Sequence, residues 1–324
     1  MIAQSAPLSN EPSDSPPICS HCGVIRSDIA PSPTGRTLLA RFLDGAGVEV
    51  GPGHHPLAIP YPGVSVRYVD RWRPDESLEL FTNVESGAAF TAPDIVANLD
   101  VDGLAALDDA SQDFVIASHL LEHLADPLRQ LGEIHRVLRV GGIGLLFLPD
   151  RRYTFDRRRE ATPLEHLVAD HEDHVTFVSD VHVEDYLRKT DDWDDSWTDD
   201  ERQSQFELHR RRSIHAHCWT QDEFLEVIVH TVGTMDMQWE LLDALFIEDV
   251  GGGSEFGMAL RRGRAGRDPA VEADRLRLTW EGLRGRAQER AALEQQLVRF
   301  RSIPGYPVVR GAWRLQRRLR RAGN

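Results

Sequence analysis

The sequence predicts an α/β fold with a mainly parallel sheet that carries helices on both faces. Short apolar runs, typical of buried strands, occur at the start of the stretch 47–54 and at residues 64–70 and 113–118. Segments with helical spacing of apolar residues lie between such runs, most clearly at residues 127–138. Strands that alternate with helices favour a parallel sheet, since parallel neighbours need a crossover connection.

The first predicted strand ends in a glycine turn, Glu49-Val-Gly-Pro-Gly53. Gly51 and Gly53 lack a Cβ, so the backbone there can adopt left-handed angles and approach a flat or anionic ligand closely. The next strand ends in Asp70, about 20 residues on, which is the spacing at which an acidic residue meets a ribose diol in nucleotide-binding units. A short helix at residues 37–43 is expected to pack beneath the first strand.

Three prolines follow the turn, at Pro56, Pro60 and Pro62, where a first crossover helix would run. Because proline breaks helix interiors, this crossover is predicted to be mostly loop. Its length is near the minimum for a parallel connection, so parallel pairing of the first two strands is expected to be tight.

The middle of the chain has a clear pattern after an amphipathic stretch at residues 74–81 and a short strand at residues 94–98. Residues 113–118 form a buried strand and residues 127–138 a helix, which Val140-Gly-Gly142 is expected to end as a C-cap turn. A strand at residues 144–148 follows.

The last part of the sheet is predicted to be an antiparallel hairpin, formed by residues 237–247 and 256–260. Thr220 is the expected N-cap of the helix before it. Between these elements and the preceding strand lies an insertion, residues 150–217, that is rich in His, Asp, Arg and aromatic residues.

Composition places the protein in a reducing compartment, because the 324 residues contain only three cysteines. No run approaches the roughly 18 apolar residues of a membrane span, so a cytoplasmic location is expected. Residues 1–30 are predicted to be a disordered arm. Cys19 and Cys22 resemble half of a zinc knuckle, but no second pair follows, and we predict no metal site.

The net charge is −15, yet residues 261–324 hold 17 arginines and only 6 acidic residues. Residues 264–324 are therefore predicted to be a basic helical extension. It could contact an anionic membrane, nucleic acid or an acidic partner, fold back on the body, or pair with its copy in a homodimer. Nucleic acid is the weakest of these, because the remaining chain is strongly acidic and repels phosphates; folding back or pairing is favoured.

The chain resembles the class I S-adenosylmethionine-dependent methyltransferases over residues 41–260. The resemblance lies in Glu49-Val-Gly-Pro-Gly53, in Asp70, and in a Leu-Glu-His-Leu and Asp-Pro series that ends at Arg136-Val-Leu-Arg-Val-Gly-Gly142. It implies a Rossmann-like, seven-stranded methyltransferase sheet over residues 31–263, with the insertion as a substrate lid. Further segments are similar to methyltransferases of bacterial glycan and natural-product biosynthesis.

The resemblance also implies a binding site for S-adenosylmethionine. Glu49 would lie near the methionine amino group, and Asp70 would accept both ribose hydroxyls. Asn98 stands where the family has an acidic residue near adenine, which is a departure. The implied cofactor-binding residues are Glu49, Gly51, Pro52, Gly53, Asp70, Arg71, Asn98, Leu99, Ser118 and His119.

Catalysis would require a base, and histidine is suited to this near pH 7. His119 or His123 is the expected base, with Asp150 orienting it; the alternative is that His123 only packs the helix. Histidines in the insertion could supply metal ligands, but no spacing among them is diagnostic of a metal site, and a substrate lid with solvated charges is favoured.

The predicted function is methyl transfer from S-adenosylmethionine to an oxygen of a small glycan precursor or secondary metabolite. A nitrogen of such a molecule is the second choice of acceptor. One alternative is a methyltransferase-like protein that no longer catalyses and binds a partner. Another is an NAD-dependent dehydrogenase, which is disfavoured because the turn lacks the third glycine of the dinucleotide motif.

Overall fold

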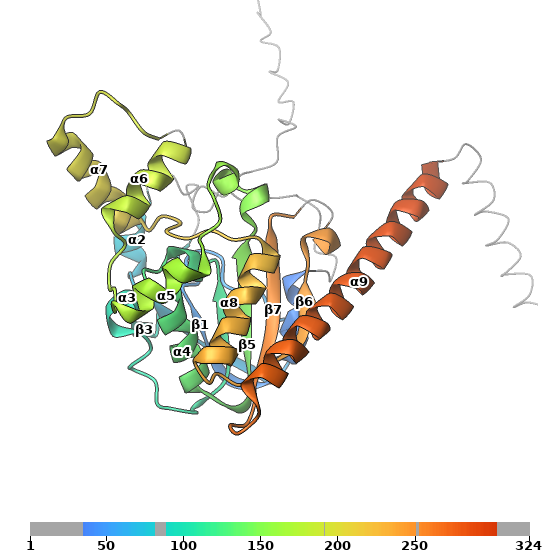
Figure 1. Cartoon of the computed structure of the whole chain (residues 1–324). Coiled ribbons are helices and arrows are strands. Elements are labelled where there is room, and N and C mark those ends of the chain that lie inside the picture. The colour runs from blue at the N-terminus through green and yellow to red at the C-terminus, as the bar shows by residue number, and fades with distance from the viewer. Residues whose placement is uncertain (1–34, 82–88, 191, 251–252, 303–324) are drawn as a thin grey trace, which may run out of the picture.

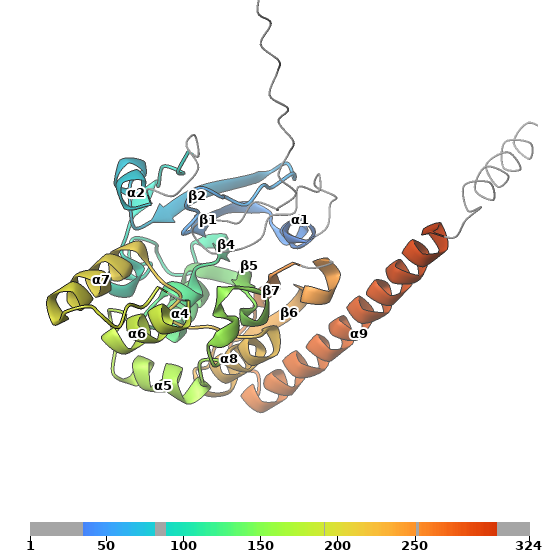
Figure 2. The same ribbon diagram turned by 90° about the horizontal axis from the view of Figure 1, so that it is seen from above.

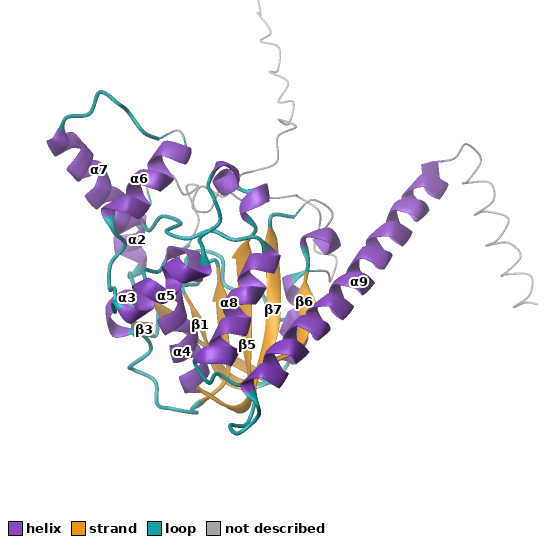
Figure 3. Cartoon of the chain, in the orientation of Figure 1, coloured by secondary structure: helices purple, strands orange, loops and turns teal. Residues whose placement is uncertain are grey.

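The structure is a computed structural model that describes residues 35–81, 89–190, 192–250 and 253–302. Its centre is a seven-stranded sheet with the order β3-β2-β1-β4-β5-β7-β6 (Figures 1 and 3). The strands are β1 Gly45–Val50, β2 Val64–Asp70, β3 Ile95–Val96, β4 Gln112–Ser118, β5 Leu138–Pro149, β6 Trp239–Leu245 and β7 Glu255–Arg262. The predicted α/β class with a terminal antiparallel hairpin is therefore confirmed.

Strands β1 to β5 run parallel, and β7 pairs antiparallel with both β5 and β6. The crossover from β1 to β2 contains no helix, as the prolines predicted, and the pair is nevertheless parallel in register from Gly45 with Val64. Parallel strands end at the same edge of a sheet. The ends of β1, β2 and β4 thus lie together.

Helices cover both faces of the sheet, as Figure 2 shows from above. The 4-residue helix α1 packs on one face, where its Leu39 lies in a buried cluster with Phe114 and Phe147. The other face is covered by α4 and α8, whose Leu131 and Phe224 belong to the main core. The helices are α1 Arg36–Leu39, α2 Pro74–Leu80, α3 Leu99–Asp102, α4 Pro127–Val137, α5 Leu164–Glu172, α6 Asp180–Lys189, α7 Asp199–Arg212, α8 Gln221–Thr234 and α9 Pro269–Ser302.

The packing of β1 against β4 depends on a glycine. A Cβ added to Gly47 would lie 2.2 Å from the backbone oxygen of Phe114 and 2.5 Å from its ring. Real Cβ atoms do not approach backbone so closely, and the neighbour here is a fully buried central strand. Only glycine therefore fits at this position.

Replacing Gly47 with alanine should destabilise the fold by about 3 kcal/mol or more, because overpacking forces the two strands apart. The midpoint of chemical unfolding measures this. Gly233→Ala, on the exposed side of α8 where an added Cβ meets nothing within 4 Å, is the matched control, and should stabilise by up to about 1 kcal/mol. Equal midpoints for the two variants would contradict the packing argument.

The start of β5 differs from the prediction of a C-cap turn at Val140-Gly-Gly142. Helix α4 ends at Val137, and β5 begins at once with Leu138 in extended conformation. The register with β4 shifts between Gln112 and Phe114, so the glycines lie in a bulge. A Cβ on Gly142 would lie within 3.0 Å of the Asp113 backbone oxygen, which is the physical reason for glycine there.

The insertion after β5 folds into α5, α6 and α7 with a small apolar cluster of its own. Val183 and Leu187 of α6 and Phe206 of α7 are buried together with Ile214. Sequence periodicity did not reveal these helices, because the surrounding residues are strongly polar. Figure 1 shows α6 and α7 at one end of the molecule, away from α9.

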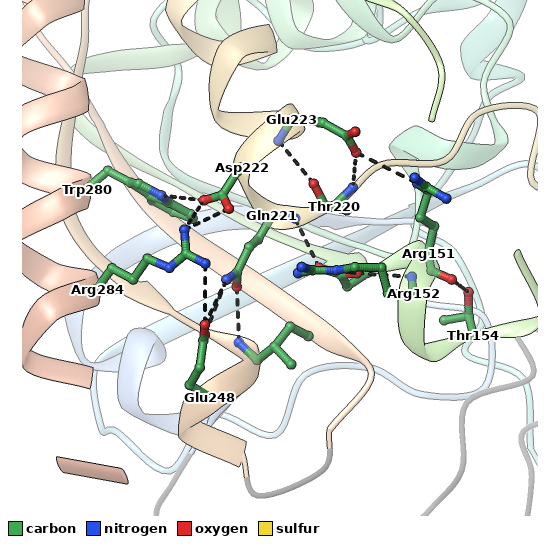
Figure 4. A network of polar contacts seen from close by, with 12 residues as sticks. Arg151, Arg152, Thr154, Thr220, Gln221, Asp222, Glu223, Glu248, Trp280 and Arg284 are labelled. Atoms are coloured by element: carbon green, nitrogen blue, oxygen red, sulfur yellow. Dashed lines mark hydrogen bonds and ion pairs between the residues drawn. The ribbon is translucent and has the colours of Figure 1, made fainter. Parts of the chain in front are cut away.

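Helix α8 begins as predicted, with Thr220 as N-cap and Glu223 completing a capping box. The long helix α9 packs its first half against α8, and Leu276 and Trp280 are buried there. Figure 4 shows how the joint is fastened: Trp280 and Arg284 of α9 both donate to the carboxylate of Asp222, at 3.1 and 2.6 Å.

Several predicted features fall outside the described residues: the arm at residues 1–30, which includes Cys19 and Cys22, and the basic end of the chain beyond residue 302. Within the described part, no helix is both long and apolar enough to cross a membrane.

Candidate active site

A cavity of about 800 Å³ opens where β1, β2 and β4 end. Gly51 and Gly53 lie in its wall with positive φ angles of 67° and 54°. A Cβ on Gly53 would meet nothing within 4 Å, so its backbone faces open space.

Asp70 lies in the same wall at the end of β2. One carboxylate oxygen accepts from the backbone N–H of Gly53 at 3.2 Å, and the other accepts from Arg71 N–H at 2.7 Å. Each oxygen retains a second lone pair, so the side chain can also accept from the two hydroxyls of a diol. Burial raises the pKa of Asp70 above its ordinary value.

Glu49 is buried beneath the glycine turn and does not border the cavity. Its two oxygens accept from the backbone N–H of Leu57 at 2.9 and 3.1 Å, which closes the loop after the turn. Burial raises the pKa of Glu49 to about 7, against the effect of this hydrogen bond. The group is therefore poised between its neutral and ionised forms near neutral pH.

The other residues implied in cofactor binding divide into two sets. Arg71, Asn98, Leu99 and His119 border the cavity together with the aromatic side chains of Trp72, Phe81 and Phe90. Pro52 and Ser118 do not border it. Asn98 uses its side-chain oxygen to cap α3 by accepting from Asp100 N–H at 3.3 Å.

His119 and His123 both border the cavity, from the turn after β4. His119 has a positive φ of 50°, which is uncommon for a residue with a side chain. Its Nε2 lies 2.9 Å from the carboxylate of Glu255. The Nδ1 of His123 donates to the carbonyl oxygen of Ile214 at 2.9 Å. Each ring thus has a fixed hydrogen-bond partner.

Glu122, between the two histidines in the sequence, is a residue that sequence reasoning missed. Its carboxylate is fully buried, and burial raises its pKa. His119 Nδ1 lies 3.5 Å from it and His123 Nε2 lies 4.0 Å from it. The Nδ1 of His215 contacts Asp156 at 2.6 Å. One ring nitrogen of His215, one ring nitrogen of His123 and a carboxylate oxygen of Glu122 all lie within 4.8 Å of one another.

The contacts of Asp150 differ from the role predicted for it. Its carboxylate accepts from Arg152 Nε at 2.8 Å and from the backbone N–H of Gln221 at 3.1 Å, so it fastens the start of α8. Among the described residues, the carboxylates that face the two histidines are Glu255 and Glu122. Glu122 could have been found from its i, i+3 spacing to His119, whereas Glu255, 136 residues away, gave no local pattern.

The pKa of Glu255 is shifted by its surroundings. Burial acts to raise this pKa, but the guanidinium of Arg36 and the ring of His119 outweigh burial and lower the pKa below its ordinary value. Glu255 is therefore ionised at neutral pH and fixes the Nε2–H of His119.

A second cavity, of about 560 Å³, adjoins the first. His123, Arg71, Asn98, Asp100 and Ser213 border both cavities. The remaining wall of the second cavity comes from the insertion and includes Thr176, Phe177, Val178, Arg210 and Ile214. The site thus consists of a first cavity at the edge of the sheet and a second cavity that the insertion covers.

Comparison with known proteins finds a family match over part of the chain. Residues 51–146 match the family model described as a methyltransferase domain. A comparison with curated proteins finds no match.

Solved structures with similar folds include the CurJ carbon methyltransferase (13% identity, TM-score 0.36). The aligned region is 68% of this chain and 49% of the CurJ chain. Others are an S-adenosylmethionine-dependent methyltransferase from Methanosarcina mazei (16% identity, 71% of this chain and 99% of that one, TM-score 0.37) and the arsenic(III) S-adenosylmethionine methyltransferase from Chlamydomonas reinhardtii (15% identity, 79% and 71%, TM-score 0.34).

The geometry of the first cavity agrees with the family match. A glycine turn faces open space, a carboxylate with two acceptor oxygens lies beside it, and aromatic side chains offer flat surfaces to a ring. Residues 51–146 therefore match a methyltransferase domain, and the cavity that they border is suited to S-adenosylmethionine as the cofactor.

Proposed function

We propose that this chain transfers a methyl group to a hydroxyl oxygen of a small glycan precursor or secondary metabolite. One observation carries the proposal: His123 borders both the cavity at the glycine turn and the adjoining cavity under the insertion. A base in this position can reach an acceptor in the second cavity while the methyl donor occupies the first.

The adjoining cavity suits a hydroxylated acceptor. Thr176, Ser213 and Arg210 offer polar groups in its wall, and Phe177 offers an aromatic face of the kind that packs on a sugar ring. The walls combine hydrogen-bonding groups with a flat apolar surface, which supports an oxygen acceptor on a glycan-like molecule.

In the proposed mechanism, Gly51, Gly53 and Asp70 hold the cofactor, which when bound supplies an electrophilic methyl group on a sulfonium sulfur. His123 accepts the proton of the acceptor hydroxyl at Nε2. Because Nδ1 donates to a carbonyl oxygen, Nδ1 carries the ring hydrogen of the neutral imidazole and Nε2 has the lone pair. His123 would thus hold the proton that the acceptor oxygen gives up as it takes the methyl group, and the neutral thioether would be the leaving group.

The proposal is tested in two steps with the full chain. Calorimetric titration with S-adenosylmethionine should show binding, and incubation with a panel of nucleotide sugars, monosaccharides and phenolic metabolites should add the mass of one CH₂ to at least one of them. A chain that binds no S-adenosylmethionine contradicts the proposal. Binding with methylation of amines alone would assign the acceptor as nitrogen, and binding without any transfer would favour a non-catalytic, partner-binding role.

Glu49 should make cofactor binding depend on pH. The family resemblance places it near the methionine amino group through a water molecule, which agrees with its position beneath the cavity wall, and a cation there favours the ionised carboxylate. Since the free protein has a Glu49 pKa of about 7, protons compete with binding below that pH. The Kd for S-adenosylmethionine should therefore fall about tenfold between pH 6 and pH 8.

Titration calorimetry at several pH values checks this, with Glu49→Gln as the control, because glutamine cannot ionise. The variant should show a flat profile over the same range. An unchanged slope in the variant would mean that another group causes the dependence.

A further inference from the structure

Three histidines of the insertion meet at one point, apart from the cavity at the glycine turn. His166 comes from α5, His182 from α6, and His217 from the segment that leads into α8. One ring nitrogen of each lies within 4.8 Å of those of the other two, and the Nε2 atoms of His166 and His182 are 2.8 Å apart. Three chain segments thus present ligand atoms to a common centre.

The rings are arranged as they would be around a metal ion. Their centroids are 5.0, 5.1 and 5.7 Å apart, and the ring planes are inclined by 58°, 76° and 58°. With Zn–N bonds of about 2.0–2.1 Å and tetrahedral angles, imidazole centroids lie about 5 Å apart and the ligand nitrogens about 3.3 Å apart. The observed centroid spacing therefore matches a tetrahedral centre closely.

The surroundings of the cluster fit a metal site as well. Ser179 Oγ lies 2.9 Å from the Nδ1 of His182, which leaves Nε2 directed at the centre. Asp170, one helical turn after His166, places a carboxylate oxygen 3.1 Å from the Nε2 of His166. Metal-bound histidines characteristically have a partner such as Ser179 on the second ring nitrogen, whereas Asp170 contacts the same Nε2 of His166 that faces His182.

Hydrogen bonding accounts for only part of the cluster. One N–H donated between His166 and His182 explains their short contact, but His217 remains. Its ring is completely buried, and apart from a weak contact with the backbone of Ala125 its nitrogens have no hydrogen-bond partner among the described residues. Leaving a buried polar atom unsatisfied costs about 1–3 kcal/mol, and an ion shared by the three rings would remove this cost.

We propose that His166, His182 and His217 bind a zinc ion through one ring nitrogen each. Three imidazole nitrogens form a donor set that zinc commonly takes. This inference replaces the prediction, made from the sequence, of no metal site. It does not depend on the acceptor or on catalysis.

The ion would fix the wall of the second cavity. Residues 173–179 join α5 to α6, and Thr176, Phe177 and Val178 of this connection border that cavity. Zinc would hold the helices at both ends of the connection and tie them to the segment before α8. Its role would therefore be structural, in the part of the insertion that faces the acceptor.

The test measures zinc in the full chain, purified without a histidine tag. The protein is treated with a chelator, titrated with ZnCl₂ by calorimetry, and analysed by elemental mass spectrometry. We expect about one zinc per chain, and in His166→Gln and His182→Gln we expect an affinity lower by at least about 10–100-fold. His166 is half-exposed, so this variant is expected to fold even if substitutions at the buried His217 do not; circular dichroism checks the fold.

Control variants separate this cluster from the other group of ligand-type side chains. His230→Gln changes a histidine of α8 outside both groups and should keep the zinc. Glu122→Gln and His215→Gln alter the group beside the first cavity and should also keep it. Retention of zinc in His166→Gln and His182→Gln together with its loss in Glu122→Gln or His215→Gln would overturn the proposal, as would a full chain that binds no zinc.

Discussion

Replacing His123 with asparagine should lower kcat by about 10²–10⁴-fold, the usual contribution of a positioned general base. Asparagine keeps an N–H near the position of the histidine Nδ1, so the hydrogen bond to the Ile214 carbonyl can persist. What is lost is the Nε2 lone pair that would take the acceptor proton. The Kd for S-adenosylmethionine should stay within about twofold, because the glycine turn and Asp70 are untouched.

The measurement is the rate of transfer of a radiolabelled methyl group to the acceptor found in the panel, beside a binding titration of the same variant. His119→Gln is the matched comparison, since glutamine keeps an N–H near the position of Nε2 for Glu255. If His119→Gln abolishes transfer while His123→Asn retains the full rate, His119 is the base and the assignment to His123 is wrong.

Asp70→Asn should raise the Kd for S-adenosylmethionine on the order of 100-fold, about 2.7 kcal/mol, because it removes the charge and one of two acceptor oxygens from a diol site. Asp70 lies in the cavity wall at the end of β2, beside the glycine turn. Hydrogen bonds to a charged acceptor are the stronger ones. The loss should appear in binding, whatever the acceptor is.

Calorimetric titration gives the Kd, and a thermal unfolding scan shows whether the loss of the Gly53 and Arg71 contacts has altered the fold. Asp75→Asn makes the same chemical change at an exposed position in the first turn of α2 and should leave the Kd unchanged. A Kd for Asp70→Asn close to that of Asp75→Asn would remove Asp70 from the cofactor site.

The sequence predicted most of the sheet, because the relevant forces are local. The apolar runs of β1, β2 and β4, the prolines after the turn and the capping box at Thr220 each depend on residues a few positions apart. The parallel arrangement then brought the ends of β1, β2 and β4 to one edge. Gly51, Gly53, Asp70 and His119 consequently lie around one cavity.

The partners of the site could not be predicted in the same way. Glu255 reaches His119 from β7, 136 residues later, and Asp150 turns to Arg152 and the start of α8. The glycines at 141 and 142 looked like a helix end, yet they lie in a bulge, where the backbone of β4 closely approaches Gly142 and Gly141 has a positive φ. In each case the neighbour that decides the role is distant in sequence.

The sequence by itself thus determined the order of the elements, the glycine turn and the acidic residue after β2, since these follow from backbone geometry and short-range periodicity. Only the tertiary structure decided which carboxylates face the two histidines and which of the insertion's histidines meet. His166, His182 and His217 belong to three segments with no common periodicity. Their convergence arises from the packing of α5 and α6 against the segment before α8, and packing between distant segments leaves no pattern along the chain.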